Sequence, residues 1–273
     1  MKKTIKHFIK SALRKIDVDI SRYGAMQQLL ARHEALQQLA AKNSRATDDI
    51  ELLLTLPYEH SHNLLRLLRK SKSQLRQDLF VLSELGFKEK GFFVEFGATN
   101  GVDLSNSYLL EKEFGWNGIL AEPAKCWHNE LKNNRICFID TNCVWKDSHS
   151  ILNFNEVSAP ELSTISSYNA EDFHGEERKT GTTYDVGTIS LNDLLEKYNA
   201  PKIIDYLSVD TEGSEFEILS NVDLDKFQFT VITCEHNFTA AREKIFSMLS
   251  RKGYVRKWEK LSKFDDWYVR ERV

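Results

Sequence analysis

The pattern of apolar and polar residues changes near residue 91. From there to residue 270, short apolar runs typical of buried strands alternate with segments of helical periodicity. The expected strands are residues 92–96, 118–122, 135–139, 203–209, 229–234, 254–258 and 266–270. The expected helices lie near residues 104–115, 124–133 and 239–252, after the capping residue Ser190 and after Gly213. This alternation predicts an α/β fold whose last two strands form a hairpin.

Before residue 71 the pattern is helical. Residues 25–56 are rich in Ala, Leu and Gln with hardly a helix breaker, and residues 58–85 form a helical lead-in. At the start of the chain, apolar positions 5, 8, 9, 13 and 16 share one helical stripe, and the lysines lie off it. Such a basic helix can rest on an anionic membrane surface, or it can pack against the rest of the chain or a partner protein. We therefore divide the chain into a helical extension, residues 1–70, and an α/β domain, residues 71–273.

A glycine turn follows the first expected strand. Residues 91–101 read GFFVEFGATNG, so that Glu95 lies in the strand and two glycines follow it. Glycine takes up positive φ and lets a ligand approach the backbone closely. One β-α unit later the next strand ends in Glu122, and a carboxylate at that position can accept hydrogen bonds from both hydroxyls of a ribose. This order of features is the plan of a nucleotide-binding crevice.

The glycine spacing favours one nucleotide over another. Dinucleotide sites use G-x-G-x-x-G, whereas this chain has Gly97-x-x-x-Gly101. Glu95 would repel a pyrophosphate but suits a ligand with an ammonium and a sulfonium group, as S-adenosylmethionine has. Two further strands end at Asp210 and Glu235, and ligands of open α/β sheets bind outside such strand ends. The sequence thus favours S-adenosylmethionine over a nicotinamide cofactor, the alternative being a strand-turn-helix corner without a ligand.

Charge and cysteine content narrow the partners and the compartment. The net charge of −3 combines a balance of +7 in residues 1–45 with −10 in the remainder. An acidic main domain repels polyanions, so nucleic acid is excluded as a substrate. The four cysteines lack C-x-x-C spacing, and no run of about 18 apolar residues occurs. We expect a cytoplasmic protein, with peripheral contact to the inner face of the membrane through its basic start.

Five segments together resemble successive motifs of the FkbM family of S-adenosylmethionine-dependent methyltransferases: FFVEFGATNGVDLSNSYLLE, GWNGILAEP, TISLNDLL, IDYLSVDTEGSEFEIL and TCEHNFTAAREKI. The lead-in SKSQLRQDLFVL and the tail FDDWYV are also similar, so the resemblance covers about residues 71–270. It implies the Rossmann-like class I methyltransferase fold, a seven-stranded sheet with an antiparallel last strand. It also implies methyl transfer, usually to a hydroxyl oxygen, often on sugars, glycans or polyketide-type products.

The resemblance implies a set of cofactor-binding residues in the first three strand-end loops: Glu95, Gly97, Ala98, Gly101, Ser105, Asn106, Glu122, Pro123, Asp140 and Asn142. The first four would line the methionine part of the cofactor, and the Ser-Asn pair would bind its carboxylate. Glu122 would hold the ribose. Asp140, Asn142 or Cys143 would meet the adenine edge, and local spacing does not choose among them.

Catalytic candidates stand in the motifs DTEG and EHN. His236 is the first candidate for the general base, because its unperturbed pKa of about 6.5 suits proton transfer; a structural histidine is the alternative. Asp210 and Glu212 would orient the acceptor or bind the cofactor amine. Alternatively, Asp210, Glu235 and His236 would hold Mg²⁺ or Mn²⁺, which lowers the pKa of an acceptor hydroxyl.

The polar segment 155–187 shows little periodicity. We expect a lid over the acceptor in which His174 or Arg178 binds acceptor hydroxyls or a carboxylate, the alternative being a solvated loop. Near the closing hairpin, Trp267 would either stack on a sugar face or pack in the core.

The sequence predicts a methyltransferase that uses S-adenosylmethionine to methylate a hydroxyl on a saccharide or glycoconjugate. The acceptor is thus a small molecule or a glycan. Within the same class, the alternatives are an N-methyltransferase and a methyltransferase of a non-sugar small molecule. Outside it stand a nicotinamide oxidoreductase and a non-catalytic scaffold.

Overall fold

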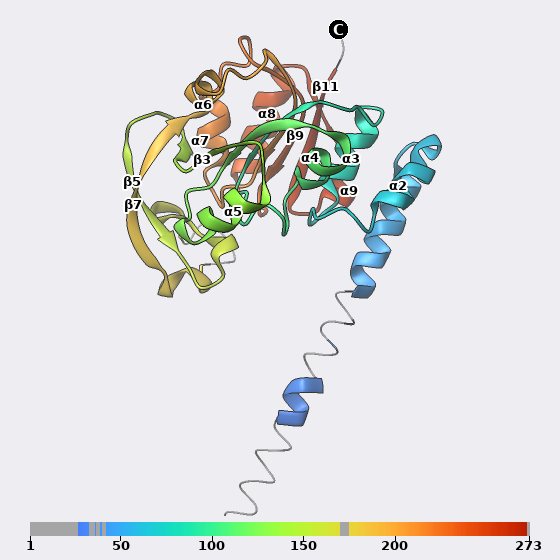
Figure 1. Cartoon of the computed structure of the whole chain (residues 1–273), viewed down its shortest axis with the longest axis horizontal. Helices are drawn as coiled ribbons and strands as arrows, with labels where there is room; N and C mark the ends of the chain where they lie inside the picture. The colour runs from blue at the N-terminus through green and yellow to red at the C-terminus, as the bar shows by residue number, and fades with distance from the viewer. Residues whose placement is uncertain (1–26, 33–35, 37–38, 40–41, 170–174, 272–273) are drawn as a thin grey trace, which may run out of the picture. The chain divides into compact units, whose positions relative to one another are not determined.

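The computed structural model describes residues 27–32, 36, 39, 42–169 and 175–271. The chain forms two units, Met1–Glu51 and Leu52–Val273 (Figure 1). The described residues of the first unit are helical. The predicted basic helix at the start of the chain lies outside the described residues, so its contact with a membrane or a partner stays a prediction. No helix in the described part of the chain is both long and apolar enough to cross a membrane.

The α/β unit begins before the predicted boundary at residue 71. Leu52, Leu56 and Leu64 are buried in one hydrophobic cluster with Phe80 of helix α3 (Gln77–Glu84). The short helices η1 (Tyr58–His60) and α2 (Ser61–Leu67) therefore belong to this unit. The apolar side chains in residues 52–64, rather than the change in sequence character near 71, decide where the unit starts.

A seven-stranded sheet forms the centre of the α/β unit, in the order β10-β11-β9-β8-β1-β2-β3. Its strands are β1 (Phe92–Phe96), β2 (Asn117–Ala121), β3 (Phe138–Asp140), β8 (Ile203–Val209), β9 (Gln228–Glu235), β10 (Tyr254–Lys257) and β11 (Asp265–Arg270). Only β11 runs antiparallel to its neighbours. The predicted α/β fold, with its mostly parallel sheet and antiparallel last strand, is confirmed.

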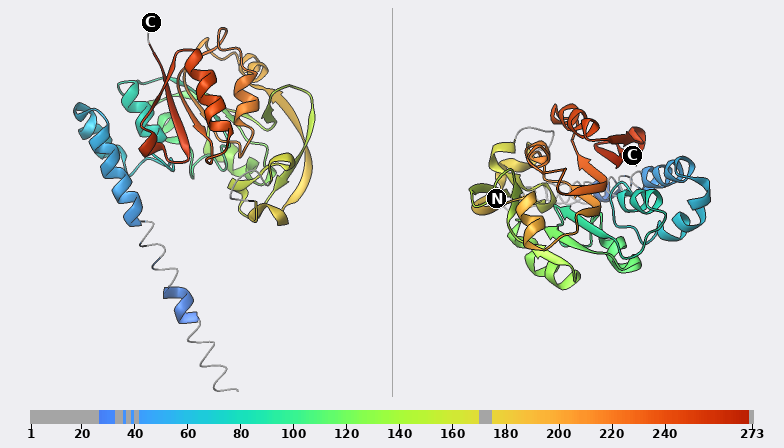
Figure 2. Two further views of the ribbon diagram at one scale, coloured as in Figure 1. Left: turned by 180° about the vertical axis from the view of Figure 1, so that it is seen from behind. Right: turned by 90° about the horizontal axis from the view of Figure 1, so that it is seen from above.

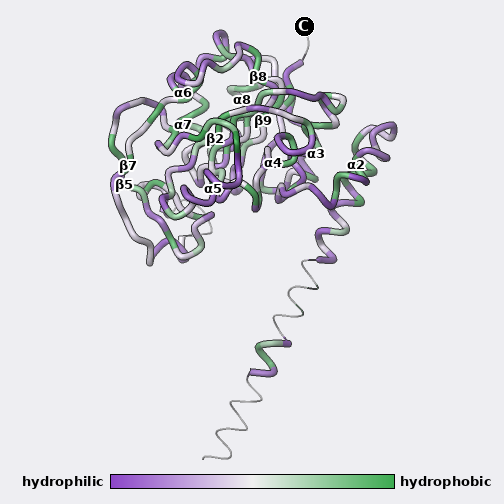
Figure 3. The backbone as a smooth tube through the Cα atoms, in the orientation of Figure 1, coloured by the Kyte–Doolittle hydropathy of each residue, from purple (hydrophilic) through white to green (hydrophobic). Residues whose placement is uncertain are grey.

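Alternating side chains of the sheet pack against helices on both faces. Val94 and Phe96 face a cluster that includes α6 (Leu191–Lys197), α7 (Glu215–Ser220) and α8 (Ala241–Arg251). On the other face, the helices α3, α4 (Tyr108–Phe114) and α5 (His128–Asn134) bury their apolar sides. Figure 2 shows the orange and red helices α7 and α8 in front of the sheet. The hydrophobic colouring in Figure 3 follows the central strands, which are covered on both sides.

A second, four-stranded sheet is inserted between β3 and β8, and we call residues 143–190 the cap. Its strands are β4 (Cys143–Trp145), β7 (Thr182–Ser190), β5 (Ile151–Glu156) and β6 (Thr164–Ile165), in that order across the sheet. The short helices η3 (Pro160–Leu162), η4 (Ser166–Tyr168) and η5 (Glu177–Thr180) connect them. Residues 155–187, for which we expected a lid with a solvated loop as the alternative, contain β6 and most of β7. The strands were missed because they cover only a small core around Trp145, Phe154 and Val186.

Arg135 is buried and fixes the loop between β1 and α4. Its Nε donates to a Glu111 carboxylate oxygen at 2.9 Å, Nη1 donates to the carbonyl oxygen of Gly101 at 3.0 Å, and Nη2 donates to Ser107 Oγ at 2.9 Å. The backbone N–H of Arg135 donates to the carbonyl oxygen of Leu131 at the end of the preceding helix, so β3 begins at Phe138 rather than at residue 135.

Replacing Arg135 with alanine is expected to lower the free energy of unfolding by about 3 kcal/mol, because Glu111 would keep a buried charge without its buried partner. Urea denaturation measures the change. Lys132→Ala is the control: Lys132 is exposed in α5, the helix that ends just before Arg135, and its replacement should change the free energy of unfolding by less than about 0.5 kcal/mol. Equal stability of the two variants would contradict the buried network.

Candidate active site

A cavity of about 470 Å³ lies at the carboxyl ends of β1, β2, β8 and β9. Residues of the cap, among them Phe154, Leu162 and Ile165, form one wall. Gln74 and Gln77, from the segment that precedes β1, also line the cavity. The position agrees with the general rule that open α/β sheets bind ligands outside the carboxyl ends of their strands.

The turn after β1 needs glycine at position 97. Gly97 has φ +71°, and a Cβ atom placed on it would lie 2.2 Å from the carbonyl oxygen of Asp210. A side chain would therefore push apart the ends of β1 and β8. This close approach of two backbones is the reason for the first glycine of the motif.

Glu95 is buried, and its carboxylate organises the loop that begins α4. It accepts hydrogen bonds from Ser105 Oγ at 3.0 Å, from the backbone N–H of Asn106 at 2.6 Å and from Ser107 Oγ. Asn106 donates from Nδ2 to Ser208 Oγ at 2.9 Å, while its buried Oδ1 has no hydrogen-bond partner among the described residues. Glu95 and Asn106 both line the cavity, so this loop presents a preorganised acceptor to a ligand.

Glu122, at the end of β2, is buried and lines the cavity together with Pro123. Its two carboxylate oxygens accept hydrogen bonds from the backbone N–H groups of Thr99 and Ala124, each at 2.8 Å. Burial outweighs these bonds and raises the pKa of Glu122 to about 7. The side chain is therefore held in one orientation beside the glycine turn.

Four other residues that were expected to bind the cofactor do not line the cavity. Ala98 and Gly101 are absent from the described cavity lining: Ala98 is buried in the core, and the carbonyl oxygen of Gly101 accepts from Arg135. Asp140 accepts hydrogen bonds from Lys197 Nζ at 2.7 Å and from Asn142 Nδ2 at 2.8 Å. Neither Asp140 nor Asn142 lines the cavity. Of the three candidates for the adenine edge, the structure places only Cys143 in the lining.

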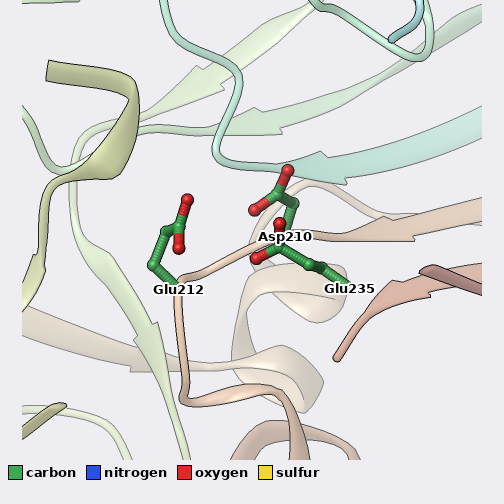
Figure 4. A group of neighbouring side chains, drawn as sticks. All are labelled: Asp210, Glu212 and Glu235. Carbon is green, nitrogen blue, oxygen red and sulfur yellow. The ribbon is translucent and has the colours of Figure 1, made fainter. Parts of the chain in front are cut away.

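Three carboxyl groups converge on the opposite side of the cavity. Oxygen atoms of Asp210, Glu212 and Glu235 all lie within 4.8 Å of one another, as Figure 4 illustrates. Burial, with the nearby charge of Glu215, raises the pKa of Asp210 to about 7. Burial and the charge of Asp210 also raise the pKa of Glu235 well above its usual value. At neutral pH the Asp210–Glu235 pair consequently retains a proton.

The His236 side chain does not line the cavity. Its ring is buried and accepts at Nδ1 from the backbone N–H of Phe238 at 3.0 Å. Nε2 lies 3.7 Å from a carboxylate oxygen of Asp266, and burial lowers the pKa of the imidazole. The structure thus does not bring His236 to Asp210 and Glu235, either as a base or as a metal ligand. Glu212 takes the third position, and Asn237 lines the cavity.

Several residues of the site were missed or misread in the sequence. Asp265 lines the cavity and accepts from Gln77 Nε2 and Trp267 Nε1, each at 3.1 Å. Trp267 is buried and stacks on Phe80 with ring centroids 4.6 Å apart, so it packs in the core rather than on a sugar face.

Arg178 is buried and does not line the cavity, so it does not bind an acceptor directly. The signals for Gln77 and Asp265 were their places in the lead-in and tail motifs. His174 lies outside the described residues.

A family model described as the methyltransferase FkbM domain matches residues 95–266, more than half of the chain. The chain belongs to the FkbM methyltransferase family. It is therefore an S-adenosylmethionine-dependent methyltransferase, and the strand order of its central sheet is that of the class I fold.

Solved structures with weaker similarity are also methyltransferases by their descriptions. A precorrin-6y C5,15-methyltransferase from Geobacter metallireducens GS-15 has a TM-score of 0.36 and 12% identity, over 70% of this chain and 84% of that chain. The N-terminal domain of human METTL16 in complex with SAH has a TM-score of 0.35 and 13% identity, over 70% and 66%. A putative RNA methyltransferase from Pyrococcus horikoshii has a TM-score of 0.31 and 12% identity, over 67% of each chain. No curated protein matches the chain.

The residues of this FkbM-family methyltransferase fit the cofactor. Gly97 lines the cavity, and the acceptor atom Asn106 Oδ1 is available to an ammonium group. Glu122 would hold the ribose, and Cys143 and Val144 give the same side of the cavity an apolar wall. The first half of the cavity therefore matches the charges and the polarity of S-adenosylmethionine.

Glu122→Ala is expected to weaken the binding of S-adenosylmethionine about 10- to 100-fold, the value of hydrogen bonds to a charged acceptor. Isothermal titration measures the change, with the exposed Glu130→Ala of α5 as the control. Because the pKa of Glu122 is about 7, the wild-type affinity should also fall as the pH drops below 7 and the carboxylate becomes protonated. Unchanged affinity in Glu122→Ala would remove this residue from the site.

Proposed function

We propose that this FkbM-family enzyme methylates a hydroxyl oxygen on a saccharide or glycoconjugate, and that the Asp210–Glu235 pair accepts the hydroxyl proton. The observation that carries the proposal is the raised pKa of this pair inside the cavity. A general base works best when its pKa lies near the operating pH. A carboxylate with an ordinary pKa near 4 would be too weak for a hydroxyl.

The polar side chains on the acceptor half of the cavity favour a saccharide. Gln74, Gln77, Glu212, Asn237 and Asp265 all line the cavity. Together these amides and carboxyl groups offer both donors and acceptors, which a ligand with several hydroxyls requires. The same carboxyl groups disfavour phosphorylated or otherwise anionic acceptors.

Each group has a distinct part in the proposed reaction. S-adenosylmethionine supplies the electrophilic methyl group. Glu122 and Asn106 would bind the donor in the first half of the cavity, and Glu212 would orient the acceptor hydroxyl in the second half. Once the Asp210–Glu235 pair has lost its retained proton, it takes the proton of the hydroxyl as the oxygen becomes a nucleophile. Because the two carboxyl groups titrate as one system, the proton belongs to the pair.

Incubation with carbon-13-methyl S-adenosylmethionine and panels of glycans and amines tests the acceptor class. The expected product is a methyl ether on a saccharide, identified by the carbon-13 shift of its methoxy group. Amines should stay unlabelled at neutral pH. Labelling of an amine, with every saccharide unchanged, would instead support the N-methyltransferase alternative.

The rate of methyl transfer should depend on the proton held by Asp210 and Glu235. Because the pKa of Asp210 is raised to about 7, kcat/KM should rise with pH up to about 7 and then level off. Asp210→Asn should lower kcat about 10²- to 10⁴-fold and remove this rise. The exposed Asp225→Asn should keep it, and so should His236→Gln, because the buried ring of His236 does not line the cavity.

The same assay separates proton transfer from metal catalysis. Because the carboxyl pair already binds a proton, activity should be unchanged after treatment with EDTA. Activity that is lost in EDTA and restored by Mg²⁺ or Mn²⁺ would show that Asp210, Glu212 and Glu235 hold a cation instead.

A further inference from the structure

Arg178 connects the cap to the catalytic carboxyl groups. It lies in η5, and its side chain is fully buried. Nη2 donates to a Glu212 carboxylate oxygen at 2.7 Å, and Nε donates to the carbonyl oxygen of Leu162 in the cavity wall at 2.9 Å. Its own carbonyl oxygen accepts from Asn155 Nδ2 of β5 at 2.8 Å. One residue thus joins the sheet of the cap through its backbone, and the wall of the cavity and the loop that follows β8 through its side chain.

The Glu212 loop is held tightly against the cap. Thr164 of β6 donates from Oγ1 to the carbonyl oxygen of Glu212 at 2.8 Å. Glu212 itself has φ +58°, and a Cβ atom on Gly213 would lie 2.9 Å from the Tyr168 ring of the cap. A non-glycine residue in the left-handed region costs energy and persists only where its surroundings require it. Here the contacts with the cap hold Glu212 in this conformation.

Arg178 also supplies the positive charge that three converging carboxyl groups need. Its guanidinium forms a buried ion pair with Glu212. Among the described residues, Asp210 and Glu235 have no such cationic partner, and these are the two groups that retain a proton. The cluster is therefore divided: an arginine neutralises Glu212, and a proton neutralises one of the two carboxyl groups beside it.

We propose that Arg178 is a positioning residue of this methyltransferase, which holds the Glu212 carboxylate ready to orient the acceptor and so makes the acceptor half of the site depend on the cap. The proposal rests on the proposed function only for the identity of the acceptor. Arg178 does not touch the cofactor half of the cavity, so the binding of S-adenosylmethionine should not depend on it.

The test compares Arg178→Met, Arg178→Lys, Glu212→Gln and the double variant Arg178→Met/Glu212→Gln, with the exposed neighbour Lys179→Met as the control. Arg178→Met should lower kcat/KM for the acceptor about 10- to 100-fold, because Glu212 loses a charged hydrogen bond. The Kd for S-adenosylmethionine should stay within about twofold. Arg178→Lys should restore part of the activity, because lysine keeps the charge but not the forked geometry.

If Arg178→Met does not fold, the double variant still decides the test. It also removes the charge of Glu212, which would otherwise stay buried without its arginine. Its activity should equal that of Glu212→Gln, because Arg178 acts through Glu212. A further loss in the double variant, or an equal loss of cofactor binding in Arg178→Met, would overturn the proposal.

Two readouts separate this proposal from the proposed function. Urea denaturation of the four proteins in the cycle measures the coupling between Arg178 and Glu212 without any acceptor, and strictly additive effects would overturn the proposal. If the wild-type enzyme methylates an amine rather than a saccharide, the proposed function fails. The same comparison on that amine then still decides whether Arg178 acts through Glu212.

Discussion

Mutual repulsion among buried carboxyl groups is the constraint on which the acceptor half of this site depends. The parallel strands β8 and β9 end at one edge of the sheet, and this brings Asp210 and Glu235 together with Glu212. Three negative charges at such distances are not stable in a site screened from water. The protein resolves the conflict in two ways: Arg178 neutralises Glu212, and a retained proton removes one of the two charges of the Asp210–Glu235 pair. The base of the proposed reaction is thus a consequence of the fold.

The two halves of the cavity stabilise their buried carboxyl groups in different ways. On the cofactor side, Glu95 is surrounded by hydroxyl and backbone donors, and Glu122 accepts two backbone N–H groups. These carboxyl groups stand apart from one another and serve as fixed acceptors. On the acceptor side the groups are clustered, so protons and the buried arginine set their charge. Under the proposed function, this difference would let one cavity bind a cationic donor and remove a proton from a neutral hydroxyl.

The sequence predicted those features that depend on local pattern. Apolar runs placed β1, β8 and β9, and Gly97 and Glu122 were found from the spacing that a turn and a strand end require. Contacts between distant segments were out of reach. Nothing in the local sequence indicates that Arg178 reaches Glu212, or that the ring of His236 lies beside Asp266 instead of Asp210. The cap was missed for a related reason, because its small sheet needs few apolar residues and gives little periodicity.

The most direct test of the account is a pH titration of the carboxyl groups by carbon-13 NMR, with Asp210→Asn and Glu235→Gln to assign the two resonances. The account predicts that Asp210 titrates at about 7 and that Glu235 titrates well above its usual pKa in the wild-type enzyme. It also predicts that removing either group lowers the pKa of the other, because their repulsion is lost. Two independent titrations near 4, as in unperturbed carboxyl groups, would contradict the retained proton and the base that it provides.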